Sequence, residues 1–262
     1  MALFTVIIPT YDRPTLLAEA IDSVLRQTVQ DFEVIVVDDG SRVPAVVPDD
    51  PRFLLIRHDS NRGLPVARNA ALAAATGEYI TFLDDDDLFM PRRLEKADGP
   101  LTLCLAQVDG SAPNPVRPDR FPERWPGPHI GQCTIRRDLC PPFDKALPIM
   151  EDFEWWIRVR ELASPSIIPQ VGYIYRTDGG PGLWRNDNNR QVRVECMKLI
   201  LEKHVAFLAG HRNFAARQWK LVGGSAMRLG DRRLARKAFT RSLRIRPSAK
   251  TLAHLTRAVL GI

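Results

Sequence analysis

Residues 3–90 alternate between short apolar runs rich in β-branched residues and longer segments with helical periodicity. The sequence predicts strands at 3–8, 34–41, 53–57 and 79–83. Their continuous apolar character is typical of strands that are buried on both faces. Pro14 begins the first intervening helix, while Pro65 and Gly77 bracket the second. The alternation predicts an α/β domain with a mostly parallel central sheet.

The rest of the chain is less regular. Residues 98–150 are rich in proline, which favours a loop region, with strands predicted at 101–108 and 132–135. A helix at 151–162 and a last strand at 167–175 follow, and then a polar loop at 177–190. With 45% hydrophobic residues, the 262-residue chain can bury one core plus an appendage. No apolar stretch is long enough to span a bilayer.

The net charge of +6 hides two opposite parts. Residues 211–262 hold 13 Lys and Arg but one acid, so this part carries about +12 and residues 1–210 about −6. The periodicity of this basic part predicts amphipathic helices. We therefore predict a main domain over 1–210, with its halves at about 1–97 and 98–210, and a basic helical C-terminal appendage over 211–262.

The cysteines give an expectation about location. Cys104, Cys133, Cys140 and Cys196 form no C-x-x-C pair, which is typical of free thiols in a reducing, cytoplasmic compartment. The N-terminal apolar run lacks a basic leader and is cut by Pro9, so it is interpreted as a strand and not as a signal peptide.

Polar residues follow three of the predicted strands. They are 10–12, 38–39 and the four consecutive acids 84–87. Ligands of open α/β sheets bind at this carboxyl edge, and four adjacent carboxylates favour a hard cation such as Mn²⁺ or Mg²⁺ over a solvated turn. Because no glycine-rich phosphate loop is present, the ion would itself neutralise a nucleotide diphosphate.

Five motifs carry a resemblance to a known family: VIIPTYDRP, QTVQDFEVIVVDDGS, NRGLPVARNAAL, GEYITFLDDDDLFMPRRL and IMEDFEWWIRV. Residues 3 to about 176 resemble the inverting family 2 glycosyltransferases of GT-A fold. The resemblance implies a GT-A type nucleotide-binding sandwich that transfers a sugar from a nucleotide diphosphate sugar, UDP type favoured, to a hydroxyl acceptor that is lipid-linked or a glycan.

The resemblance also implies roles for single residues. Those placed around the nucleotide are Pro9, Thr10, Tyr11, Asp12, Asp39 and Arg68. Tyr11 would lie against the base, Asp39 would accept a hydrogen bond from its imide, and Arg68 would sit near the base or its phosphates. Asp84 and Asp85 would approach the ribose, and Asp86 would coordinate the metal. Structural alternatives stay open: a turn role for Asp12, a salt bridge for Arg68 and a strand-end cap for Asp39.

By the same resemblance Asp152 is the general base and Glu151 lies beside it, although acids are also stabilised at a helix N-terminus. Trp156 is predicted to be core, and Trp155 a sugar contact. Many relatives carry a metal-binding His after the Tyr-Arg pair, whereas here Tyr175-Arg176 precedes Asp178, which could substitute. Arg185 and Arg190 could close over the diphosphate.

Two other functions are compatible with parts of the pattern. One is an aspartate-based phosphotransfer enzyme, but Leu88 follows the acidic run and the nucleotide signature would then be unexplained. The other is a non-catalytic nucleotide-binding scaffold. For 211–262 the alternatives are intramolecular packing, peripheral contact with anionic lipid at the inner face of the membrane, and nucleic-acid binding, which is disfavoured because no aromatic platform accompanies the charge.

Overall fold

The structure is a computed structural model that describes residues 2–97, 99–108, 128–176 and 189–260. The described chain forms two compact units. The strands of the first unit are β1 (Phe4–Thr10), β2 (Phe32–Asp38), β3 (Phe53–Arg57), β4 (Tyr79–Phe82), β5 (Leu88–Phe89), β6 (Leu101–Val108), β7 (Cys133–Arg136) and β8 (Ser166–Tyr175). Its α-helices are α1 (Pro14–Leu25), α2 (Leu64–Ala74) and α3 (Glu151–Leu162). The helices of the second unit are α4 (Arg190–Lys203), α5 (Val205–Gly210), α6 (Arg212–Arg228), α7 (Arg232–Ile245) and α8 (Ala249–Leu260).

The strands form one sheet of order β3-β2-β1-β4-β7-β6-β8-β5. The first four neighbours pair in parallel, as predicted. Beyond β4 the sheet is mixed, because β7 is antiparallel to both β4 and β6, and β5 is antiparallel to β8. Strand order reverses between β1 and β4, which places a ligand-binding edge at their carboxyl ends.

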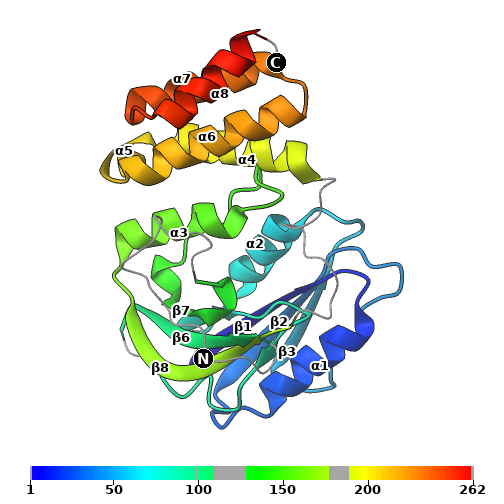
Figure 1. The fold of residues 1–262 in the computed structure, drawn as a ribbon. Coiled ribbons are helices and arrows are strands. Elements are labelled where there is room, and N and C mark those ends of the chain that lie inside the picture. Colours follow the sequence, from blue (N-terminus) through cyan, green and yellow to red (C-terminus); the bar gives the residue numbers. More distant parts are fainter. Residues whose placement is uncertain (1, 98, 109–127, 177–188, 261–262) are drawn as a thin grey trace. The chain divides into compact units, whose positions relative to one another are not determined.

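Helices cover both faces of the parallel half. Val6 and Ile8 of β1 belong to a core cluster with Leu17 and Ile21 of α1, while α2 packs against β1 and β2 from the other side (Figure 1). All seven residues of β1 are buried. This is the reason for its continuous apolar sequence, since a strand with one wet face would alternate.

The predicted elements agree closely with the observed ones. The strands at 53–57 and 101–108 and the helix at 151–162 have the predicted bounds. The two-residue strand β5 and the helices α4 and α5 were not predicted. The predicted loop at 177–190 falls almost wholly outside the described residues.

The C-terminal unit confirms the prediction of amphipathic helices in the basic region. Ala235 and Phe239 of α7 form a small core with Ala226 of α6 and Ala258 of α8. This unit also contains α4 and α5, whereas the predicted domain boundary lay at 210; that assignment stays a prediction. Within the described ranges, no helix combines the length and apolar character that crossing a membrane requires.

Two neighbouring glycines of α6 offer a test of the packing in this unit. A Cβ at Gly223 would lie 2.6 Å from the ring of Phe239, whereas a Cβ at Gly224 meets nothing within 4 Å. Gly223→Ala is expected to lower the free energy of unfolding by about 1–3 kcal/mol through overpacking. Gly224→Ala is expected to raise it by up to about 1 kcal/mol through helix propensity. Urea unfolding of both variants checks this, and equal effects would contradict the α6 to α7 packing.

Candidate active site

The residues that follow β1, β2 and β4 meet at one edge of the sheet. β1 and β2 are in register, with Thr10 opposite Asp38. The Thr10 hydroxyl donates to Asp85 Oδ2 at 2.7 Å, which joins the end of β1 to the acidic run after β4. The predicted clustering of polar residues at this edge is therefore present.

The four acids after β4 alternate in burial. Asp84 and Asp86 are half-buried, whereas Asp85 and Asp87 are buried. Asp87 accepts hydrogen bonds from the Tyr173 hydroxyl and from a backbone N–H of the chain after β8. Asp84 and Asp86 are thus the members of the run that a ligand can reach.

Burial sets the protonation of the two inward acids. It raises the pKa of Asp85 to about 6, against the opposing effect of its Thr10 hydrogen bond. It raises the pKa of Asp87 to about 8, and the negative charge of Asp84 adds to this shift. The run therefore carries less negative charge at neutral pH than its four carboxyls suggest.

Arg13 is a site residue that the sequence analysis missed. Its Nη1 donates to Asp85 Oδ1 at 3.0 Å and to Asp86 Oδ2 at 2.7 Å. It follows the TYD motif directly, but a lone arginine at the start of a helix has no distinctive pattern. The second oxygen of Asp86 has no hydrogen bond within the described chain.

Arg68 of α2 links the acidic run to the head of α3. It is only 2% exposed, and it donates to Asp84 Oδ1 at 2.8 Å and to Glu151 Oε1 at 2.7 Å. Its guanidinium carbon also lies 5.3 Å from the ring centroid of Phe143. The predicted salt-bridge alternative for Arg68 is therefore present, and it joins residues assigned to two separate parts of the site.

This guanidinium controls the charge of Asp84. Burial would raise the pKa of Asp84, but Arg68, aided by His129 and Arg13, overcomes it and lowers that pKa. Asp84 is consequently ionised at neutral pH.

Glu151 and Asp152 open α3. Glu151 is buried on Arg68, while Asp152 is half-buried and accepts a hydrogen bond from the N–H of Phe153 at 2.7 Å. Burial raises the pKa of both carboxyls despite the attraction of Arg68, to about 7 for Glu151. Of the two, Asp152 is the more accessible and is free of an ion pair in the described chain.

Asp39 lies buried directly after β2, and both of its carboxylate oxygens have partners. Its carboxylate accepts from the backbone N–H groups of Arg62 and Gly63, the shorter contact being 2.8 Å, and lies 2.6 Å from His58 Nδ1. These bonds order the segment that enters α2. The strand-end cap alternative for Asp39 is present, and its contact with a base stays a prediction.

The chain after β1 turns sharply. Asp12 has a positive φ of 54°, and its carboxylate accepts from the backbone N–H of Arg42 at 2.8 Å. Tyr11 is 43% exposed, whereas Pro9 is buried within β1. Asp12 thus has the turn role left open by the sequence, and Tyr11 is the residue of this segment that is available to a ligand.

Among the residues that the structure describes, one group of side chains could hold a metal ion. Single oxygen or nitrogen atoms of Asp84, Asp87 and His129 lie within 4.8 Å of one another. His129 Nε2 is 3.5 Å from Asp84 Oδ2. Carboxylates are the ligand type that suits Mn²⁺ or Mg²⁺, but both oxygens of Asp87 already accept hydrogen bonds, so Asp84 is the carboxylate of this group that is available to an ion.

The hydrogen bond at the other ring nitrogen of His129 affects this fit. Nδ1 accepts from the Gly131 N–H at 3.3 Å, so Nε2 carries the hydrogen toward Asp84. Ligation through Nε2 would require the opposite tautomer. The sequence analysis missed His129 because it is a single His in a proline-rich stretch.

Trp155 and Trp156 are both core residues, at 0% and 1% exposure. The Trp155 ring stacks on Phe143 at 5.6 Å and packs edge-on against Phe82. The predicted sugar contact of Trp155 is therefore wrong, and the predicted core position of Trp156 is confirmed. Trp155 thus packs between α3 and β4.

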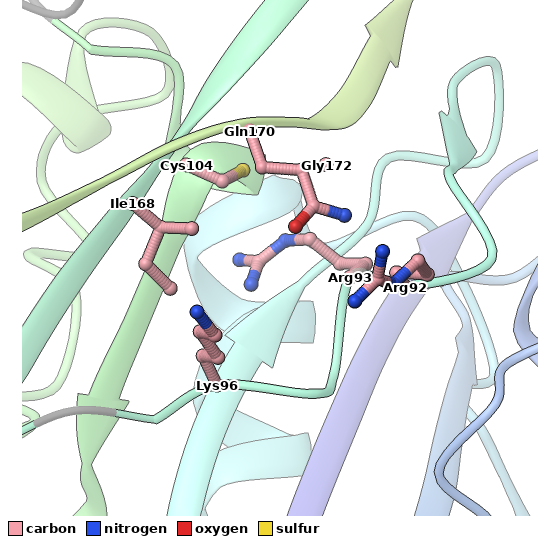
Figure 2. A pocket seen from close by; sticks show the side chains of 7 residues that line it. All are labelled: Arg92, Arg93, Lys96, Cys104, Ile168, Gln170 and Gly172. Carbon is pink, nitrogen blue, oxygen red and sulfur yellow. The ribbon is translucent and has the colours of Figure 1, made fainter.

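A small cavity in the first unit is lined by residues other than those described above (Figure 2). It has a volume of about 10 Å³ and is lined by cationic side chains and by Cys104 and Gly172. Arg93 is buried there and donates to Thr134 Oγ1 at 2.7 Å and to two backbone carbonyls. The space is sufficient for a single water only, so this arginine is structural.

Three further residues were predicted to act at this site. Asp178 and Arg185 are outside the described residues. Arg190 begins α4 in the second unit, and its approach to a diphosphate stays a prediction.

The architecture is that of the GT-A glycosyltransferase fold. TarS of Staphylococcus aureus (residues 1–349), solved with UDP-GlcNAc, matches with a TM-score of 0.69 at 18% identity, over 99% of this chain and 88% of that one. The mannosyltransferase PcManGT of Pyrobaculum calidifontis, solved with GDP-Man and Mn²⁺, matches with a TM-score of 0.59 at 18% identity, over 98% and 79%. The predicted fold class is confirmed.

Residues 5–103 match the sequence model of glycosyl transferase family 2. An uncharacterized glycosyltransferase of Haemophilus influenzae is 38% identical over 96 residues, which are 36% of this chain and 33% of the relative. The putative colanic acid biosynthesis glycosyl transferase WcaA of Escherichia coli is 42% identical over 98 residues, 35% of each chain. The matched stretch thus spans about a third of these relatives, and the resemblance inferred from the motifs is confirmed there.

Proposed function

We propose that this chain is a metal-dependent inverting glycosyltransferase that moves a sugar from a nucleotide diphosphate sugar to a hydroxyl acceptor. The observation that carries the proposal is the Arg68 bridge, since it holds Asp84 of the donor edge and Glu151 of α3 on one buried guanidinium. A donor at the sheet edge would then lie beside Asp152. The relatives support the donor class, because TarS was solved with UDP-GlcNAc and the mannosyltransferase with GDP-Man.

The donor would lie along the ends of β1, β2 and β4. In this proposal Pro9, Thr10 and Tyr11 line the base pocket, with the exposed Tyr11 ring against the base. Asp39 orders the segment that enters α2. It also accepts a hydrogen bond from the imide of the base. The UDP type is favoured.

The acidic run would divide its tasks by exposure. Asp84 would reach the ribose. Asp85, which is bonded to Thr10 and Arg13, would help to hold the acidic run in place. Asp86, with one oxygen free of hydrogen bonds in the described chain, would hold Mn²⁺ or Mg²⁺. When bound, the ion would neutralise the charge that develops on the leaving diphosphate.

Asp152 would be the general base. Its carboxylate takes the proton of the acceptor hydroxyl while that oxygen attacks the anomeric carbon from the face opposite the diphosphate. The bond from the anomeric carbon to the phosphate oxygen breaks, and its electron pair leaves with the nucleoside diphosphate. The acceptor, a lipid-linked or glycan hydroxyl, therefore gains the sugar with inverted configuration.

Asp86→Asn tests the metal part of this proposal. Removing the charge is expected to weaken Mn²⁺-dependent binding of UDP-sugars by at least roughly tenfold, and Mn²⁺-dependent donor hydrolysis with it. Isothermal titration with and without Mn²⁺ measures the first effect, and release of UDP the second. The control is Asp138→Asn, an exposed acid paired only with Arg136. Metal dependence that is equal in the two variants would remove Asp86 from the metal site.

A further inference from the structure

The basic charge of the C-terminal unit is concentrated in its last two helices. Residues 232–262 contain nine Lys and Arg and no acid. The apolar side of α7 is used in packing, because Ala235, Ala238 and Phe239 are buried. The cations lie on the remaining sides of the helix.

A minority of these cations contact a partner within the unit. Arg241 donates to Glu202 at 2.6 Å and lies over the ring of Trp219, and Arg246 donates to Asn213. Four others on α7 are exposed and make neither an ion pair nor a hydrogen bond with any described residue. They are Arg233, Arg236, Lys237 and Arg244.

These four cations share one side of α7. At 100° per residue, they fall within an arc of about 100° that is opposite the buried residues. α8 packs against α7 and adds Lys250 and Arg257, both exposed. Burial, and then the charge of Arg257 and Lys250, lowers the pKa of His254. The surface thus holds positive charge without internal compensation.

α8 also exposes apolar side chains, on a different side of the helix from Lys250 and Arg257. Leu252, Val259 and Leu260 are 55%, 59% and 66% exposed. Leu252 and Val259 are seven residues apart and so lie on the same face of the helix. A surface that combines cations with exposed aliphatic side chains is typical of helices that lie in a bilayer interface.

We propose that the α7–α8 surface, defined as Arg233, Arg236, Lys237 and Arg244 of α7 with Leu252 and Val259 of α8, docks on an anionic phospholipid bilayer. The cations meet the headgroups, and the aliphatic side chains enter the boundary with the acyl chains. A bilayer fits better than a nucleic acid, because Phe214, Trp219 and Phe239 of this unit are buried and cannot stack on bases. The proposal does not depend on the glycosyl transfer proposed above.

Vesicle co-sedimentation with the full chain tests it. The chain is expected to bind vesicles that contain phosphatidylglycerol, but not vesicles of phosphatidylcholine alone, and to dissociate as salt is raised. Replacing the four unpaired cations of α7 by Gln is expected to weaken binding roughly fivefold for each cation, and several hundredfold together. Circular dichroism establishes that the helices persist.

A matched control removes equal charge from the other unit. Four of the exposed cations of that unit, Arg26, Lys96, Arg136 and Lys145, are replaced by Gln. This variant is expected to bind anionic vesicles as the wild type does. Equal loss in both variants would overturn the proposal, because binding would then follow net charge and not this surface.

The aliphatic residues separate a bilayer from other polyanions. Leu252→Ser with Val259→Ser is expected to weaken vesicle binding while leaving binding to heparin unchanged. Tighter binding of duplex DNA or RNA than of anionic vesicles at the same salt would overturn the assignment to a bilayer. So would an absence of vesicle binding by the wild-type chain.

Discussion

Asp152→Asn is expected to lower the rate of donor turnover by about 10²–10⁴-fold, which is the usual contribution of a general base. The amide cannot take the acceptor proton, but its size and its place at the head of α3 are unchanged. Donor affinity is expected to stay within a factor of about two, because Asp152 has neither a hydrogen bond nor an ion pair with the described residues at the donor-binding strand ends. Release of UDP from UDP-sugars with Mn²⁺ measures the rate, and isothermal titration measures the affinity.

Glu161→Gln is the matched control, since Glu161 is an exposed acid on the same helix. It is expected to turn over donor at the wild-type rate. Wild-type turnover by Asp152→Asn would remove Asp152 from the role of base. If that variant also bound the donor normally, another carboxylate at the head of α3 would become the candidate for the base.

The raised pKa of Asp152 sets the direction of the pH dependence. A base must be deprotonated, and burial shifts its pKa upward from the ordinary value of 3.8. The rate should therefore fall as pH is lowered, with the fall beginning above the range of an exposed aspartate. Asp152→Asn should lack this acidic limb, while Glu161→Gln should retain it.

Arg68→Met is expected to lower the free energy of unfolding by about 3–5 kcal/mol, the usual cost of leaving a buried ion pair without one partner. Two carboxylates, Asp84 and Glu151, would lose the cation that neutralises them inside the protein. Donor turnover is expected to fall as well, because these acids would no longer be held together. Urea unfolding and UDP release measure the two effects.

Two further variants separate the electrostatic cause from loss of packing. Arg136→Met breaks an exposed pair with Asp138 and is expected to change stability by less than about 1 kcal/mol. Adding Glu151→Gln to Arg68→Met is expected to restore part of the lost stability, since one uncompensated charge is removed. If Arg68→Met were as stable as the wild type, the Arg68 bridge would not contribute to the free energy of unfolding.

The strands and helices of the first unit were largely predictable because their signals are local. β1, β2 and β4 are buried on both faces, and such strands need continuous apolar sequence. Proline at a helix start and glycine after its end then marked α2. The antiparallel insertion of β7 was not predictable, since nothing in residues 133–136 encodes the direction of their partners.

The candidate site was predictable in composition but not in arrangement. The acids after β4 and at the head of α3 stand out in the sequence. Arg13 and His129 do not, because a single charged residue beside a helix start or among prolines has no distinctive pattern. Trp155 was misassigned because its place on α3 is compatible both with the core and with a sugar.

The order of residues along the chain was sufficient to place acids at the carboxyl ends of three parallel strands, because strand direction follows from the alternation of strand and helix. It was not sufficient to tell Asp84 and Asp86 from Asp85 and Asp87. That distinction depends on partners far away in sequence: Thr10 lies 75 residues from Asp85, and Tyr173 lies 86 residues from Asp87. The bridge from Arg68 to Glu151 spans 83 residues. Such contacts form only when the sheet and α3 pack together, and the burial that comes with packing then sets the charge of each carboxyl.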